Sequence, residues 1–155
     1  METNNYLLEA LKDIARLFNQ ADIKYCLIGG LAVGVLATPR ATEDIDFLVF
    51  VDPSERSRIE DILKQTFLLI QSKEPVNLSF GKLWRLIIKR KNHKELIILD
   101  ILTADSQELQ DAIEAAFTIE LSNVLIPVIS RQDLIKMKSS SQRTKDRADA
   151  PGQEA

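Results

Sequence analysis

The chain has one cysteine, Cys26, and one histidine, His93, among its 155 residues. A lone cysteine cannot form an internal disulfide, and a zinc site built on thiolates is excluded because its ligands are missing. Any bound metal must therefore be held mainly by oxygen atoms.

Long apolar segments are missing as well. No stretch approaches the roughly 18 uninterrupted apolar residues of a membrane-spanning helix, and the first residues lack the basic and apolar regions of a secretory signal. We therefore expect a cytoplasmic protein with no membrane partner. The composition, 45% hydrophobic and 28% charged, is that of a globular protein. The length predicts a single domain over residues 1–150, with 151–155 as a disordered tail.

The charge is unevenly distributed along the chain, although the formal net charge is only -3. Lys82–Lys94 contains six basic residues and no acid, and residues 131–149 hold six basic residues against three acids. Such segregation indicates a site for phosphates or nucleic acid. The alternative is that both segments are solvated faces of a hairpin and a helix.

The hydrophobic pattern predicts helices mixed with strands. Two strand-like runs flank the polar segment 90–94, which indicates an antiparallel hairpin with a basic tip. Helices are predicted over Asn4–Gln20, Leu31–Ala37, a segment that is capped at Asp52-Pro53 and runs to Phe67, Asp105–Phe117 and Ser130–Lys138; strands are predicted over Tyr25–Ile28, Ile45–Val51, Leu83–Lys89, Glu95–Leu102 and Val124–Ile129.

Three acidic residues occupy positions where an unpaired carboxylate would destabilise the fold. Asp44 and Asp46 are two residues apart at the start of a predicted strand, so both carboxylates point to the same side. Asp100 interrupts an apolar run and looks buried, and a buried acid needs a partner. If the two strands are neighbours, three carboxylates converge and can hold Mg²⁺ for phosphoryl or nucleotidyl transfer. The alternative is a pair of solvent-facing acids plus an Asp100 that pairs with a lysine such as Lys89.

Gly29 and Gly30 lie between a predicted strand and a predicted helix. Without side chains, this turn lets the backbone approach a ligand closely and point its amides at a phosphate. The pair matches neither the GxGxxG fingerprint nor the phosphate loop of NTPases. The glycine pair indicates a phosphate-binding turn only in combination with the acidic residues that follow it in the sequence.

These residues together resemble the DNA polymerase β-like nucleotidyltransferase superfamily. The shared pattern is a glycine turn, a short helix, Asp-x-Asp on the next strand after 13 intervening residues, and a later Asp on an apolar strand. The minimal nucleotidyltransferases and the AbiE-type toxin nucleotidyltransferases are the most similar branch. The segment from Asp133 to Asp149 is similar to the helix pair that ends their catalytic core.

The resemblance implies a mixed β-sheet flanked by helices, in the α/β (α+β) class, with Mg²⁺ as cofactor and a nucleoside triphosphate as substrate. Asp44, Asp46 and Asp100 would be metal ligands, and Asp100 could also serve as the general base. The triphosphate-binding residues would be Gly29 and Gly30, with Lys138 and Arg143 offsetting phosphate charge and Arg40 and Thr42 assisting.

Three functions remain open at this stage. The first is Mg²⁺-dependent transfer of a nucleotide to a hydroxyl on RNA, protein or a small molecule, within a toxin-antitoxin or phage-defence system. The second is a catalytically inactive subunit of the same fold that binds a cognate partner protein. It is favoured by Gly30, which replaces the serine often found there. The third is a nucleic-acid binder that uses the Lys82–Lys94 strip.

Overall fold

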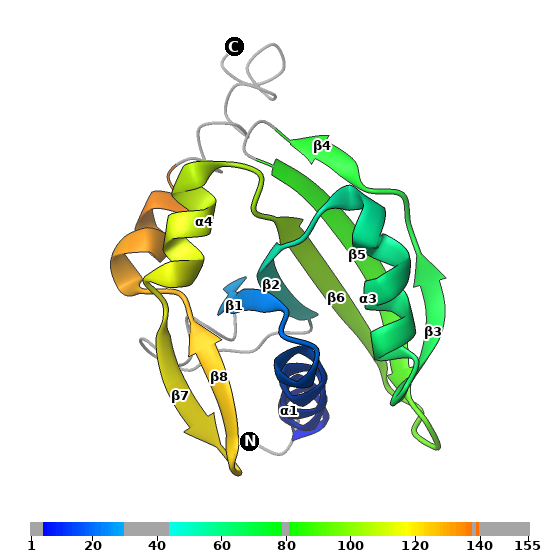
Figure 1. Cartoon of the computed structure of the whole chain (residues 1–155). Coiled ribbons are helices and arrows are strands. Elements are labelled where there is room, and N and C mark those ends of the chain that lie inside the picture. Colours follow the sequence, from blue (N-terminus) through cyan, green and yellow to red (C-terminus); the bar gives the residue numbers. More distant parts are fainter. Residues whose placement is uncertain (1–4, 30–43, 79–80, 138, 140–155) are drawn as a thin grey trace, which may run out of the picture.

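The computed structural model describes residues 5–29, 44–78, 81–137 and 139. Within these residues, eight strands form one sheet in the order β3-β5-β6-β2-β1-β8-β7, with β4 paired to the start of β5 along the same edge as β3 (Figure 1). The pairs β2–β6 and β1–β8 are parallel and the remaining pairs are antiparallel, so the sheet is mixed as predicted. The strands are β1 Lys24–Ile28, β2 Asp44–Phe50, β3 Phe67–Ser72, β4 Val76–Leu78, β5 Gly81–Arg90, β6 Leu96–Thr103, β7 Phe117–Leu121 and β8 Val124–Val128.

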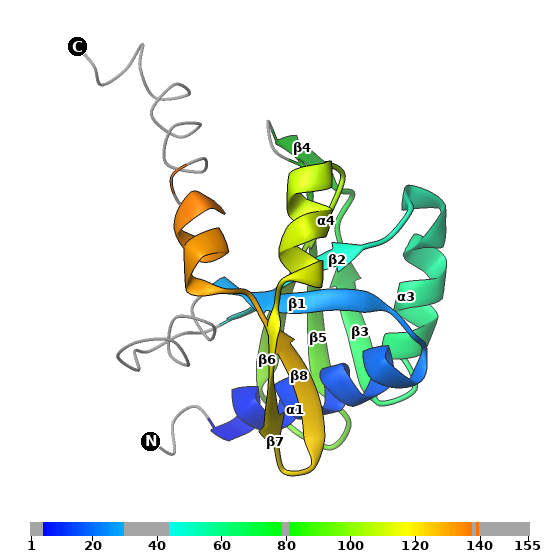
Figure 2. The ribbon, with the colours of Figure 1, turned by 60° about the vertical axis from the view of Figure 1, so that its left-hand side comes forward.

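Helices cover the sheet on both sides. The ring of Phe47 in β2 packs against Phe18 of α1 (Asn5–Gln20), whereas the next residue, Leu48, points to the other face of the sheet. Leu102, the register partner of Leu48, lies beside Leu109 of α4 (Gln107–Glu114), so α4 lies on the face opposite α1. The short helix α3 (Arg56–Leu63) lies beside α1 and follows the 3₁₀ turn η2 (Pro53–Glu55). Figure 2 shows α1 and α4 on different sides of β1.

An aromatic cluster fixes α1 to the sheet. Phe18, Tyr25 and Phe47 pack with their ring centroids 5.2 to 5.7 Å apart, two of the pairs edge to face. All three side chains are almost fully buried. This cluster holds β1 and β2 against the helix, and the opposite face of both strands is where the candidate site lies.

Two predicted helices are shorter than expected. Phe67 begins β3 and does not end a helix, because α3 stops at Leu63 and the following apolar run pairs with β5. Phe117 likewise begins β7, whose partner is β8. A single aromatic residue fits the apolar stripe of a helix and the start of a strand equally well, so periodicity alone could not decide.

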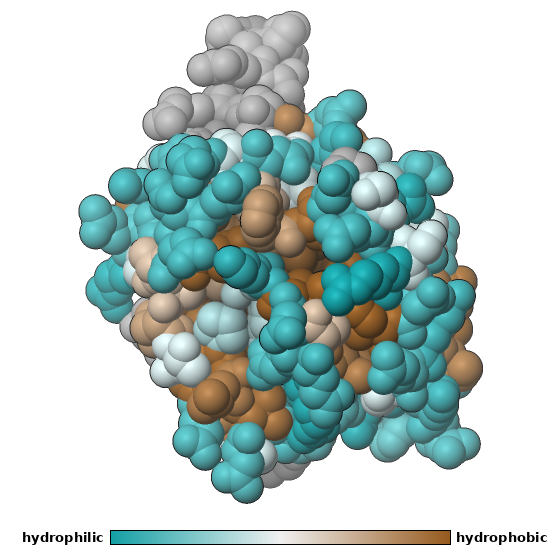
Figure 3. All heavy atoms as spheres, viewed as in Figure 1, coloured by the Kyte–Doolittle hydropathy of each residue, from teal (hydrophilic) through white to brown (hydrophobic). Residues whose placement is uncertain are grey.

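One face of the molecule shows apolar residues near its centre. On the face turned toward the viewer in Figure 3, apolar residues show between α4 and α3 and hydrophilic residues surround them. No helix within the described residues is long and apolar enough to cross a membrane.

Candidate active site

The carboxylates of Asp44, Asp46 and Asp100 gather on one face of the sheet. Asp46 and Asp100 are register partners on the parallel strands β2 and β6, and Asp44 lies two residues before Asp46 on the same side of β2. One oxygen from each of the three residues lies within 4.8 Å of the others. We call this set the carboxylate cluster. The structure therefore brings together the three acids singled out from the sequence.

Arg85 of β5 binds one member of the cluster. Its Nε donates to Oδ1 of Asp100 and its Nη2 donates to Oδ2, and both donor–acceptor distances are 2.8 Å, so the ion pair is bidentate. Asp100 is 7% exposed and is the one charged residue among the described residues that are buried. The sequence suggested Lys89 as a partner for this acid. Lys89 instead lies opposite Leu96, and Arg85, which lies opposite Asp100, makes the pair.

The surroundings of Asp46 disfavour its ionised form. Burial, and after it the neighbouring carboxylates of Asp44 and Asp100, raise the pKa of Asp46 from 3.8 to about 7, although Arg85 acts in the opposite direction. The hydrogen bond to Asp100 raises the pKa of Arg85 above its ordinary value. Among the described residues, the charge of Arg85 does not cancel the effect of burial and of the two neighbouring carboxylates on Asp46, so a further cation beside Asp46 would be bound favourably.

Gly29, at the end of β1, allows its backbone to touch the cluster. Its φ is +79°, in the left-handed region that favours glycine, and a Cβ there would overlap Oδ2 of Asp46. The residue type at 29 is thus fixed both by backbone conformation and by the space that Asp46 occupies. A role of Gly29 in binding a triphosphate stays a prediction.

The donor set fits a hard divalent cation. Its members are carboxylate oxygens close enough to share one ion, and one of the acids is only partly ionised near neutral pH without a cation. Mg²⁺ prefers such oxygen ligands and leaves positions open for water and phosphate oxygens. Asp44, Asp46 and Asp100 are the residues that would hold it.

The other sequence-predicted site residues lie outside the described residues. They are Gly30, Arg40, Thr42, Lys138 and Arg143. The helix expected from Ser130 is present over residues 131–137, and the Ser130 hydroxyl accepts the backbone N–H of Asp133 at its start. The predicted tail, 151–155, also lies outside the described residues.

Comparison with known proteins gives matches at the level of structure only. No protein-family model matches the chain, and no curated protein sequence matches it. TM1012 from Thermotoga maritima, a presumed nucleotidyltransferase, is similar with a TM-score of 0.68 and 14% identity over 92% of this chain and 89% of that one. JHP933 from Helicobacter pylori gives a TM-score of 0.55 and 16% identity over 89% of this chain, which spans 56% of that protein. ANT(2")-Ia in complex with adenylyl-2"-tobramycin gives 0.51 and 13% over 88% and 76% of the two chains.

The chain has a nucleotidyltransferase fold. The fold class predicted from the sequence is thereby confirmed. The AbiE-type toxin branch stays a proposal.

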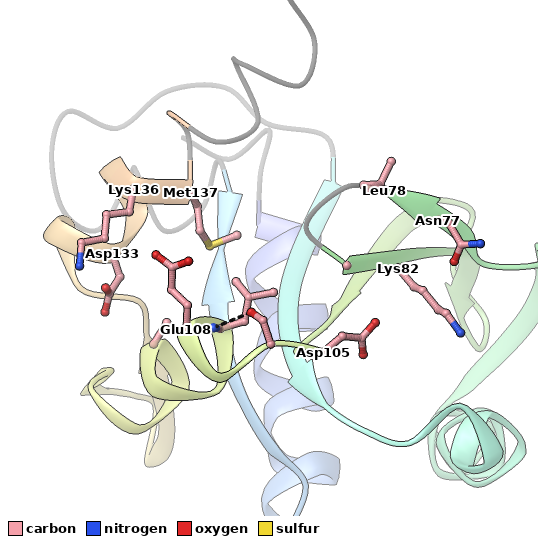
Figure 4. Close-up of a pocket in the computed structure, with 12 residues that line it drawn as sticks. Asn77, Leu78, Lys82, Asp105, Glu108, Asp133, Lys136 and Met137 are labelled. Carbon is pink, nitrogen blue, oxygen red and sulfur yellow. Dashed lines mark hydrogen bonds between the residues drawn. The ribbon is translucent and has the colours of Figure 1, made fainter. Parts of the chain in front are cut away.

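A second feature of this nucleotidyltransferase fold, which the sequence did not reveal, is a cleft of about 530 Å³ beside α4. Charged groups from three elements line it, among them Lys82 of β5, Glu108 of α4 and Lys136 of the segment 131–137. Figure 4 shows Glu108 and Met137 pointing toward each other across it. Lys82 lies three residues before Arg85, about 10 Å along β5. Its residues come from distant parts of the chain, and no local pattern marks them.

The basic strip from Lys82 to Lys94 is divided by the nucleotidyltransferase sheet. Arg85 and Lys89 point to the face that carries the cluster, whereas Lys82 and Arg90 belong to the alternate set along β5. Arg85 pairs with Asp100, and Arg90 lies 3.1 Å from Asp13 of α1. The strip is therefore two sets of residues with separate partners, which weakens the case for one continuous nucleic-acid surface.

Proposed function

We propose that this chain is a metal-dependent nucleotidyltransferase that moves a nucleotide from a nucleoside triphosphate to a hydroxyl group. The observation that carries the proposal is the carboxylate cluster, whose members come from adjacent parallel strands and lie within 4.8 Å of one another in this fold. A bound Mg²⁺ would supply charge stabilisation for the phosphates and lower the pKa of an attacking oxygen.

The roles of the chain's own residues follow from their positions. The attacking hydroxyl forms a bond to the α-phosphorus of the triphosphate, and the bond to the pyrophosphate leaving group breaks. Asp44 and Asp46 would hold the metal ion that binds the reacting phosphate, and Asp100, the register partner of Asp46 on β6, would accept the proton of the hydroxyl. Gly29 keeps the backbone close to these atoms.

The acceptor class stays part of the proposal. RNA, protein and small molecules all carry suitable hydroxyls, and the structure of ANT(2")-Ia holds an adenylylated small molecule. The cleft beside α4 has the volume of sites that bind small molecules. A cytoplasmic location and a cognate partner in a toxin-antitoxin or phage-defence system belong to the same proposal.

One observation favours a second candidate. The Arg85–Asp100 ion pair uses both oxygens of the third carboxylate, as expected if Asp100 serves the fold and not the chemistry. In that case the chain would be an inactive nucleotidyltransferase-fold subunit that acts by binding a partner protein.

The deciding experiment is label transfer. The protein is incubated with each of the four α-³²P-labelled nucleoside triphosphates, with Mg²⁺ or with EDTA, and with total RNA, with cell protein or with a panel of hydroxylated small molecules. We expect Mg²⁺-dependent label on one acceptor class, abolished in Asp44→Asn and Asp46→Asn and retained in the control Glu120→Gln, an exposed acid of β7. Transfer that survives both aspartate changes would remove the enzymatic proposal. Absence of transfer in every arm would favour the binding subunit.

A further inference from the structure

Arg85, Asp100 and Asp46 form one row across three strands. Arg85 is the register partner of Asp100 on the antiparallel pair β5–β6, and Asp100 is the register partner of Asp46 on the parallel pair β6–β2. Register partners point to the same face of a sheet. The guanidinium is therefore the cation that lies next to the carboxylate cluster on its β5 side.

The two ends of this ion pair differ in their freedom to move. The Asp100 side chain is 9% exposed and belongs to a central strand, whereas the Arg85 side chain is 44% exposed. Opening the pair would leave Asp100 buried and in need of a new cation, but it would release Arg85 into solvent, where an arginine is readily hydrated. A divalent ion bound by Asp44, Asp46 and Asp100 supplies that new cation.

The released guanidinium has a natural second partner. Arginine binds phosphate and carboxylate with the same bidentate geometry, so a group shaped to hold Asp100 is equally shaped to hold a phosphate. The phosphates of a nucleoside triphosphate would bind next to the metal ligands, within reach of a side chain that already contacts one of them.

We propose that Arg85 is an exchangeable counter-ion: it holds Asp100 while the site is free of metal, and it moves to the phosphates of the nucleotide when the metal loads. This inference rests on the proposed function. It makes Arg85 a competitor of the metal and a partner of the nucleotide, so its removal should change the two affinities in opposite directions.

The test uses the intact 155-residue chain and two variants of it, Arg85→Gln and Arg85→Lys, with Lys89→Gln as the matched control. Lys89 lies on the same face of β5 but opposite Leu96, so its loss removes the same charge without touching Asp100. Mn²⁺ affinity of the nucleotide-free protein is measured by calorimetry. Affinity for a non-hydrolysable triphosphate analogue is then measured at saturating Mn²⁺.

We expect Arg85→Gln to bind Mn²⁺ about 10-fold more tightly than the wild type, because the charge-assisted contact of Arg85 with Asp100 no longer competes with the ion. The variant should bind the nucleotide about 10-fold more weakly, because the charge-assisted contact of Arg85 with the phosphates is lost. Arg85→Lys should tighten Mn²⁺ binding at least threefold, roughly half the effect in free energy, because it keeps the charge but loses the fork. Lys89→Gln should change either affinity by less than about twofold.

Several results would overturn the proposal. Equal Mn²⁺ affinity in Arg85→Lys and wild type, with a gain in Arg85→Gln alone, would show a net-charge effect and no competition. Unchanged nucleotide affinity in Arg85→Gln would refute the transfer to phosphate. If the wild type itself binds no Mn²⁺, the proposed function fails together with this inference. If the wild type binds Mn²⁺ and transfers nucleotide while both Arg85 variants behave like it, only the inference fails.

A measurement on the wild type guards against misfolded variants. The Nε–H resonance of Arg85 in a ¹⁵N NMR spectrum reports its hydrogen bond to Asp100. Diamagnetic Mg²⁺ should shift this resonance toward that of a solvated arginine, and the triphosphate analogue should shift it again. A resonance that stays in place through both additions would contradict the exchange.

Discussion

Asp46 and Asp100 face each other directly across the parallel strands β2 and β6. Two carboxylates in this position repel each other, and the nearby Asp44 adds a third negative charge. This repulsion destabilises the sheet locally, and a bound cation or a proton can relieve it.

The stability of the metal-free protein should depend on the ionisation of Asp46. Its pKa is about 7 in the folded protein and 3.8 ordinarily. The folded state thus binds more protons than the unfolded state between these values, so this residue makes the free energy of unfolding fall as pH rises from about 4 to 7. Relative to the wild type, Asp46→Asn should gain stability over that range, by up to about 4 kcal/mol above pH 8.

Urea denaturation in EDTA at pH 5, 6, 7 and 8 measures this difference. The control Glu120→Gln, an exposed acid on β7, should give a nearly constant difference across the series. A flat difference for Asp46→Asn would contradict the raised pKa.

Magnesium should stabilise the folded protein and displace a proton. An ion that binds only the native state adds about 2.7 kcal/mol at a concentration 100 times its dissociation constant. The effect should be larger at pH 8 than at pH 6, since Asp46 must lose its proton to become a ligand. Thermal melts with and without Mg²⁺ measure the shift, and calorimetry in buffers of different ionisation enthalpy measures the released proton. Asp44→Asn should lose both effects; a full shift in that variant would place the ion elsewhere.

Gly29→Ala should weaken metal binding in a protein that still folds. The left-handed backbone at this position costs an alanine about 1 to 2 kcal/mol, and the new Cβ would push the Asp46 carboxylate out of the cluster. We expect a protein that is folded by circular dichroism but binds Mn²⁺ at least about 10-fold more weakly, a loss of about 1.4 kcal/mol. Normal Mn²⁺ affinity in a folded Gly29→Ala protein would show that Asp46 can move aside at no cost to the site.

Much of the site could be predicted because it depends on short-range pattern. The spacing of Asp44 and Asp46 on a strand determines their common side, and the apolar residues around Asp100 reveal its burial. Their convergence required only that β2 and β6 be neighbours. Arg85 could not be selected, since six basic residues lie between Lys82 and Lys94 and only the register of β5 against β6 decides which one meets Asp100.

The fold was predicted less completely at its edges. Strands β3, β4 and β7 were missed because edge strands carry mixed burial and need a partner strand to be recognised. For this reason Phe67 and Phe117, which the sequence pattern assigns to helix ends, are found at the starts of strands. The cleft beside α4 is built by residues distant in the chain, which no local pattern reveals.

The cap of α4 offers a test of stability separate from the cluster. The Ser106 hydroxyl accepts the backbone N–H of Leu109 over 3.2 Å at the start of this helix. Ser106→Ala should lower the free energy of unfolding by about 1 kcal/mol, and Ser106→Asp should restore most of it. Both variants should bind Mn²⁺ like the wild type. A loss of Mn²⁺ affinity in Ser106→Ala would show that α4 helps to position the carboxylates.

Strand β2 joins two demands in consecutive residues, since Phe47 completes the aromatic cluster with Phe18 and Tyr25 while Asp46 faces the other way. Deleting one residue from this strand would drive a carboxylate between the two remaining aromatic rings and turn the ring of Phe47 toward the ion site. A shift in the register of β2 is therefore unfavourable on both faces of the strand. The spacing of the acids is thus tied to the hydrophobic packing of the same strand, and the frame of β2 must be kept for both.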